Sequence, residues 1–307
     1  MNWDDIGDAM FGGLPVYGEI LALVQNSVWA GAILGLVGGL IGVFVLQRDM
    51  AFAVHGISEL SFAGAAAALL IGADVVTGSI VGSVIAAGLI GWLGARARDR
   101  NSVIGVMMPF GLGLGILFLA LYDGRSANRF SLLTGQIVSV QSGQLTWLIV
   151  ISAFVLVALL LIWRPLRFDS LDPQSAAARG VPTVGISLAF MLLLGLTVAV
   201  AVHIIGALLV MALLVTPAAA AVRVATGPVA VPLLAAAFGV VSAVGGILLA
   251  VAGTLPVSPY ITTISFAIYL VCRVIGSRRG RVVRADAATS APGAGATSTP
   301  AASAARG

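Results

Sequence analysis

His55 and Glu59 are the two residues of this sequence whose types and spacing best suit metal chemistry. They lie four positions apart inside a stretch, 50–73, that is otherwise typical of a membrane-spanning helix. An imidazole and a carboxylate at this spacing project from the same helix face, and together they suit divalent transition metals. An ionisable residue in hydrocarbon costs about 2.5–3.5 kcal/mol and normally faces a partner, a cavity or a pathway. The pair therefore predicts a route for a metal ion or a proton through a membrane.

The composition indicates a membrane protein with several spans. Of the 307 residues, 60% are hydrophobic and only 9% are charged, whereas soluble domains carry about 25% charged residues. Gly and Ala are abundant, as at helix interfaces in lipid. The N-terminus is acidic where a cleavable signal peptide would be basic. We therefore expect an all-α polytopic fold without a large soluble domain.

The basic residues and the single cysteine exclude several classes of function. All sixteen basic residues are Arg, and a Walker A motif needs Lys to hold phosphates, so any ATPase that drives this protein must be another chain. Cys272 cannot form an intrachain disulfide, and we expect it to be an apolar filler. The arginines lie in short clusters between apolar segments, which favours membrane orientation over nucleic-acid binding.

Nine apolar segments approach the roughly 20 residues that a membrane-spanning helix needs. They are 26–46, 52–72, 75–93, 103–122, 143–163, 181–201, 203–222, 229–252 and 258–276. The joins at 72–75 and 201–203 are short, so we predict hairpins there, or broken helices that meet inside the protein. In the first segment, glycines between Gly31 and Gly42 are spaced for a close helix contact, although ordinary glycine use in membranes would give a similar pattern.

The arginines fall unequally on the two sides of these segments. One side collects Arg48, Arg96, Arg98, Arg100, Arg164, Arg167, Arg179, Arg223, Arg273, Arg278, Arg279, Arg281 and Arg284. The other side has Arg125 and Arg129 beside Asp74. The positive-inside rule then places residues 1–25 outside and the basic tail, 277–307, in the cytoplasm. From Ala285 onward the tail consists mostly of small and polar residues, which predicts disorder.

The longest cytoplasmic loop, 164–180, predicts a short helix between two spans. Asp172 can cap it with Pro173 at the first helical position. After Arg179, Gly180 can end it in a left-handed conformation. Such a helix either docks a partner protein or is a capped connector.

Four segments resemble the permease subunit of bacterial zinc/manganese/iron ABC importers. They are GGLIGVFVLQRDMAF at 38–52, LTGQIVSV at 133–140, DP at 172–173 with ARGV at 178–181, and GALLVMALLVTPAAAA at 206–221. Their joint order and spacing are similar to that family over the transmembrane domain, 26–276. The resemblance implies a multi-pass permease of the bacterial cytoplasmic membrane that is not itself an enzyme.

The resemblance also assigns a role to the opening pair. The family's second span usually reads G-D-A-x-S-H-A, with Asp and His as metal ligands. Here His55 stands at the Asp position, Glu59 stands at the His position, and Ser58 matches directly. The resemblance therefore implies that His55 and Glu59 bind the transported ion, Zn²⁺, Mn²⁺ or Fe²⁺, with the ligand order reversed and no permanently bound cofactor.

The resemblance further implies a complex of several chains. A second permease subunit, most simply a homodimer, would bring two copies of His55 and Glu59 around one ion at a two-fold axis. ABC ATPase subunits would dock on the loop through Asp172, Pro173, Arg179 and Gly180. An extracytoplasmic metal-binding protein would deliver the ion.

The remaining candidate residues have weaker patterns. His203 has no acidic neighbour in sequence and is either a ligand on the access path or a packed histidine. Asp74 and Asp123 lie at predicted outer ends of spans, where solvated carboxylates are common. Thr216 and Pro217 favour a kinked span in which the hydroxyl satisfies a freed backbone group.

Three alternatives to metal import stay open at this point. His55 and Glu59 could relay protons in a secondary transporter that works without an ATPase, or could simply bond to each other. An intramembrane serine protease would have only His55 and His203 as candidate bases, with no G-x-S-x-G motif, and H-E-x-x-H is absent. The enzyme class is therefore disfavoured.

Overall fold

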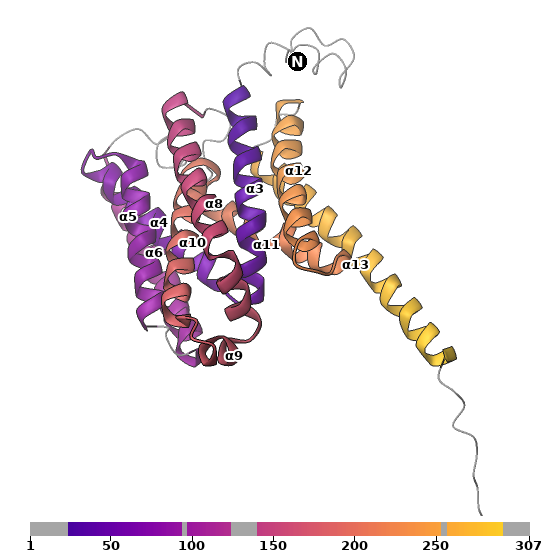
Figure 1. The fold of residues 1–307 in the computed structure, drawn as a ribbon. Coiled ribbons are helices and arrows are strands. Elements are labelled where there is room, and N and C mark those ends of the chain that lie inside the picture. The colour runs from indigo at the N-terminus through magenta and orange to yellow at the C-terminus, as the bar shows by residue number, and fades with distance from the viewer. Residues whose placement is uncertain (1–23, 94–96, 124–139, 253–256, 291–307) are drawn as a thin grey trace, which may run out of the picture.

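The chain is a bundle of helices, as its composition predicted. The computed structural model describes residues 24–93, 97–123, 140–252 and 257–290, and these ranges contain no strand (Figure 1). The helices are α3 (Gln25–Gln47), α4 (Ala51–Leu70), α5 (Val75–Leu93), α6 (Ala97–Leu121), α8 (Ser142–Leu171), α9 (Pro173–Ala178), α10 (Thr183–Ile205), α11 (Ala207–Val224), α12 (Ala230–Ala252) and α13 (Val257–Ser290).

Eight of the described helices are long and apolar enough to cross a membrane, not nine. The segment predicted at 203–222 corresponds to α11, an 18-residue helix whose described apolar stretch covers Leu209–Val224. The predicted segment over 203–222 is thus a helix that begins later than expected, because α10 continues to Ile205 and the chain breaks at Gly206. Gly206 has φ 84° and ψ 154°, a conformation that is essentially restricted to glycine. The predicted orientation in the membrane stays a prediction.

The helices pack in two groups that α8 and α10 connect. In the first group α4 packs against α5 and α6, and α10 packs against α5. In the second group α3 packs against α12, and α11 packs against α3, α12 and α13. Helix α8 contacts both α3 and α10 (Figure 1). The core between the groups includes the fully buried rings of Phe44 and Phe190, and the ring of Phe62 is fully buried between α4 and α6.

Glycines allow the closest helix approaches, as predicted for the first span. A Cβ at Gly39 would lie 2.4 Å from the carbonyl oxygen of Ala235 on α12, so no larger residue fits that crossing. In the α4–α5 hairpin, a Cβ at Gly64 would lie 2.2 Å from the Gly78 carbonyl oxygen. The hairpin predicted at the 72–75 join is thus confirmed, and Gly72 turns it with φ 70°.

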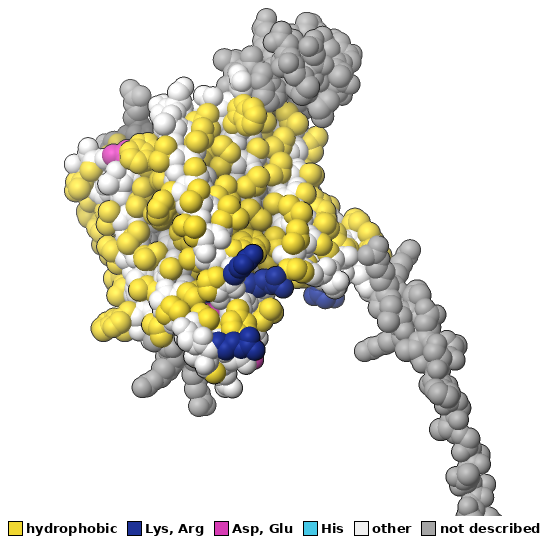
Figure 2. Space-filling view, in the orientation of Figure 1, with side chains coloured by type: hydrophobic (Ala, Val, Ile, Leu, Met, Phe, Trp, Pro, Cys, Tyr) yellow, Lys and Arg dark blue, Asp and Glu magenta, His cyan; other side chains and the backbone are white. Residues whose placement is uncertain are grey.

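Apolar side chains cover the visible face of the bundle, and basic side chains gather at its lower end (Figure 2). The arginines whose side chains are described are Arg48, Arg164, Arg167, Arg179, Arg223 and Arg273. Arg48 bonds to Asp169, and the Arg179 guanidinium lies over the Phe168 ring. The ends of α3 and α8 therefore share one side with α9, and the end of α11 lines a cavity with them. Arg125, Arg129 and the motif at 133–139 lie outside the described residues.

The last helix is longer than the sequence indicated. Helix α13 continues to Ser290, so residues 285–290 are helical where the composition predicted disorder. Ala is the strongest helix former, and no proline interrupts this segment before Pro292, so the helix extends beyond the apolar stretch. Residues 291–307 lie outside the described ranges, as do residues 1–23.

Candidate metal site

Helix α4 brings His55 and Glu59 together. The Nε2 atom of His55 lies 3.5 Å from Oε1 of Glu59, one helical turn further along. The His55 side chain is 30% exposed and the Glu59 side chain 5%. The pair predicted from the sequence is therefore formed, with the imidazole at the surface of this chain and the carboxylate inside it.

The Glu59 carboxylate is incompletely satisfied. Its Oε2 atom is buried and has no hydrogen-bond partner among the described residues. Helix α6 encloses this region, because a Cβ at Gly111 would lie 2.6 Å from Leu60 Cδ1 and 3.1 Å from the Glu59 carbonyl carbon. Buried polar atoms nearly always have a partner, and an unpaired buried acceptor costs about 1–3 kcal/mol. An open acceptor next to an imidazole is an arrangement that a cation could complete.

A series of buried hydroxyl groups holds α4 in place, and the sequence reasoning missed it. The Ser58 hydroxyl donates to the Ala207 carbonyl at 3.0 Å, directly after the Gly206 break. Ser61 and Ser79 share a hydrogen bond of 2.7 Å, and Ser79 donates to Ala199 O at 3.1 Å. These bonds tie α4 to α5, α10 and α11. The sequence does place Ser58 and Ser61 three positions apart, on either side of Glu59. That spacing puts both hydroxyls on one helix face but does not identify the carbonyls that they contact.

His203 does not join the pair. Both of its ring nitrogens are buried without a hydrogen-bond partner among the described residues. Within those residues, no three His, Cys, Asp or Glu side chains form a group that could hold a metal ion. One chain therefore offers two ligands at the α4 site, and the role of His203 on an access path stays a prediction.

Asp74 caps α5 at the opposite end from the arginines. Its Oδ2 accepts hydrogen bonds from the backbone N–H and the hydroxyl of Thr77, both at 2.8 Å. These bonds keep the pKa of the exposed Asp74 carboxyl below its usual value, and the bond from the backbone N–H has the larger effect. Electrostatic attraction to His203 lowers this pKa further by a smaller amount. The local geometry is that of a helix cap.

The other weak candidates occupy ordinary positions. Asp123 is exposed directly after α6. Pro217 lies inside α11. Cys272 is buried at 5% exposure on α13.

The predicted loop helix has the expected caps. Helix α9 begins with Pro173, and the Asp172 carboxylate accepts a hydrogen bond of 3.0 Å from Ser175 N–H. The Ser175 hydroxyl also bonds to Asp172. Arg179 follows the helix, and Gly180 reverses the chain with φ 80°. Most of α9 is exposed apart from Ala176, so its surface is available to another molecule.

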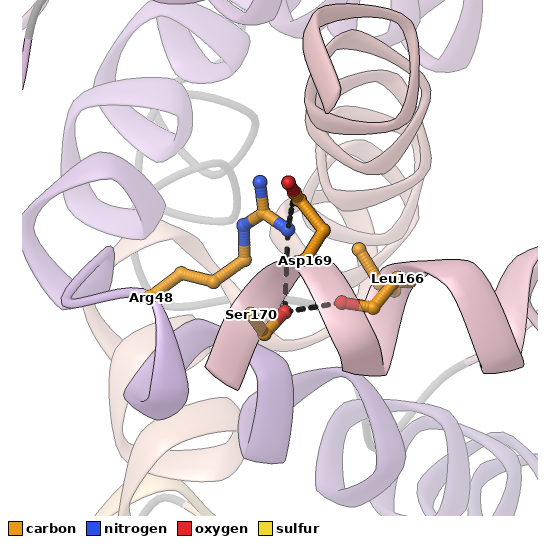
Figure 3. A network of polar contacts seen from close by, with 4 residues as sticks. All are labelled: Arg48, Leu166, Asp169 and Ser170. Carbon is orange, nitrogen blue, oxygen red and sulfur yellow. Dashed lines mark hydrogen bonds and ion pairs between the residues drawn. The ribbon is translucent and has the colours of Figure 1, made fainter. Parts of the chain in front are cut away.

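An ion pair that the sequence reasoning missed connects α3 to the base of this loop (Figure 3). The Arg48 guanidinium bonds to Asp169 at 2.9 Å and to the Ser170 hydroxyl at 3.2 Å. Ser170 in turn donates to the Leu166 carbonyl at 2.6 Å. Asp169 is 3% exposed. The two charges are 121 positions apart, so no local pattern pairs them.

Known proteins are similar to this chain over most of its length. Residues 21–276 match the model of the ABC 3 transport family. A manganese transport system membrane protein, MntC, from Halalkalibacterium halodurans is 33% identical over 73% of this chain and 77% of that protein. A high-affinity zinc uptake system membrane protein, ZnuB, from Buchnera aphidicola is 26% identical over 80% of this chain and 94% of that protein.

Solved structures resemble the described fold. PsaBC from Streptococcus pneumoniae, in complex with Fab, has a TM-score of 0.76 at 25% identity and covers 85% of this chain and 95% of that one. With the apolar helices, this likeness indicates a multi-pass bacterial membrane protein. The family match covers most of the sequence, and it is supported by a relative that is one-third identical. The chain therefore belongs to the ABC 3 transport family.

Proposed function

We propose that this chain is the membrane permease subunit of an ATP-driven importer, and that the imported ion is a divalent transition metal held by His55 and Glu59. The observation that carries the proposal is the open Oε2 atom of Glu59, buried beside an imidazole 3.5 Å from Oε1. The names of the relatives, which specify manganese and zinc transport, support this class of cargo.

The ligand types limit which ions suit the site. Imidazole and carboxylate bind Zn²⁺, Mn²⁺ and Fe²⁺, while the lack of thiolate disfavours Cu⁺. A single chain supplies two ligands, and the partial exposure of His55 lets the imidazole contact a ligand from outside the chain. A second permease subunit would complete the set with its own imidazole and carboxylate. The metal would then be cargo rather than a resident cofactor.

Helix α9 is the proposed contact for a separate ATPase chain. It is short, capped at both ends, and largely exposed on the side where the arginines lie. The Arg48–Asp169 pair fixes the end of α8, three residues before Asp172, to α3. A movement imposed on α9 would therefore reach the helix that leads into α4. An extracytoplasmic protein that delivers the metal is the other expected partner.

The test is transport by a reconstituted complex. The chain and its cognate ATPase are placed in liposomes with the extracytoplasmic metal-binding protein, and ATP-dependent uptake of Mn²⁺, Zn²⁺ and Fe²⁺ is measured for wild type, His55→Ala and Glu59→Gln. Asp123→Asn is the matched control, because it removes an exposed carboxylate outside the pair. We expect both pair variants to lose uptake of every metal that wild type carries, and the control to retain it.

Two results would contradict the proposal. Wild-type uptake by both pair variants would remove the site assignment. Uptake that persists with an inactive ATPase and follows a proton gradient would instead support the secondary transporter with a His55–Glu59 relay.

A further inference from the structure

A cavity of about 360 Å³ opens at the arginine-rich end of the helices. It lies between the ends of α3, α8 and α11 and the start of α12. Its larger apolar lining residues, which form an apolar wall, are Val43, Phe44, Trp163, Leu171, Val222 and Val231. The Phe44 and Trp163 rings meet edge-on with centroids 4.8 Å apart. This wall is therefore a packed part of the fold that still leaves a volume open to an apolar ligand.

The charge that lines this cavity is positive and uncompensated. Arg167 is the charged residue of the lining, and no acidic residue lines it. Arg167 forms no hydrogen bond or ion pair with the residues that the structure describes. Asp169, two positions away, is already bonded to Arg48. Arg164 and Arg223 are exposed and adjacent in sequence to the lining residues Trp163 and Val222.

We propose that this cavity binds one anionic phospholipid, with its phosphate at Arg167 and an acyl chain along the apolar wall. Tryptophan is enriched at the depth of lipid headgroups, and the lining comes from the terminal turns of membrane helices. Basic pockets between membrane helices attract anionic headgroups. The charge and the apolar wall together fit a phospholipid, whereas a free anion would use only the charge.

The proposal is tested by native mass spectrometry of the purified full-length protein in detergent, without metal. Phosphatidylglycerol and phosphatidylcholine with identical acyl chains are added in turn. We expect wild type to retain phosphatidylglycerol preferentially. Arg167→Gln should weaken its binding by about fivefold, the effect of one arginine near a lipid phosphate.

Two further variants separate a built site from general attraction. Arg273→Gln removes an exposed arginine on α13 that does not line the cavity, so lipid binding should stay at the wild-type level. Val222→Trp keeps the charge but fills the cavity from a side chain that is 47% exposed, so folding is preserved and lipid binding should fall.

Several outcomes would overturn the proposal. Equal retention of the two lipids would exclude recognition of the headgroup charge. Equal losses in Arg167→Gln and Arg273→Gln would indicate attraction to the whole basic surface. Unchanged binding in Val222→Trp, or displacement of the lipid by an equal concentration of inorganic phosphate, would show that the apolar wall has no part.

Discussion

The Arg48–Asp169 pair and the His55–Glu59 pair differ in how completely their atoms are hydrogen-bonded. In the Arg48–Asp169 pair, the guanidinium contacts a carboxylate at 2.9 Å and a hydroxyl that is itself bonded to the backbone. In the His55–Glu59 pair, the closest approach is 3.5 Å and one carboxylate oxygen has no partner among the described residues. A satisfied polar network fixes one structure, whereas an unsatisfied one favours a ligand. The comparison separates a structural pair from the pair that we propose to bind the transported ion.

The largest expected effect is on transport through the unsatisfied pair. Glu59→Gln keeps the shape of the side chain but removes the charge that a cation would neutralise. We expect uptake to fall to the level of empty liposomes while the free energy of unfolding in detergent stays the same or rises. A large loss of stability with partial uptake would instead indicate that Glu59 is structural.

Disrupting the Arg48–Asp169 pair should lower the free energy of unfolding, in contrast to Glu59→Gln. Asp169→Ala leaves the Arg48 charge, 11% exposed, without its carboxylate, and breaking a buried pair from one side costs about 3–5 kcal/mol. Chemical unfolding in detergent measures this loss. The double variant Arg48→Met with Asp169→Leu should recover most of it, because apolar replacements of a buried pair are often neutral. A double variant as unstable as the single one would contradict this view of the pair.

The lengths and ends of most helices follow from the local sequence, whereas the contacts between distant helices do not. Hydrophobic length predicts most of the helices, and the types of Asp172, Pro173 and Gly180 predict both ends of α9. The break at Gly206 was placed several residues too early, because the sequence on both sides is continuously apolar. The site pair is one helical turn apart and so was visible. The Arg48–Asp169 and Ser58–Ala207 contacts join distant segments, which only tertiary packing brings together.

A smaller effect is expected at the break beside the site. Gly206→Ala places a Cβ on a backbone with φ 84° and ψ 154°, and such strain costs about 1–3 kcal/mol. Because Ser58 bonds to the next residue, we also expect lower metal uptake per folded molecule. Gly113→Ala on α6 is the control, since a Cβ there meets no neighbouring atom. Equal stability of the two variants would show that the break tolerates a side chain.

The smallest effect concerns the cap of α9. Hydrogen bonds from the Ser175 hydroxyl and then its backbone N–H lower the pKa of the exposed Asp172 carboxyl. A lowered folded-state pKa means that the cap is fully present above the unfolded-state pKa and is lost as pH falls through the folded-state value. Asp172→Ala should therefore speed hydrogen exchange at Ser175 near neutral pH, and Asp172→Asn should do so less. Identical exchange in wild type and Asp172→Ala would exclude the cap.

The central claim is that His55 and Glu59 bind the transported ion directly. Pulsed electron paramagnetic resonance of Mn²⁺ bound to the purified permease detects nitrogen coordinated to the metal. We predict a nitrogen modulation in wild type that disappears in His55→Ala and is retained in His203→Ala, with weaker binding in Glu59→Gln. An unchanged nitrogen signal in His55→Ala would contradict the account.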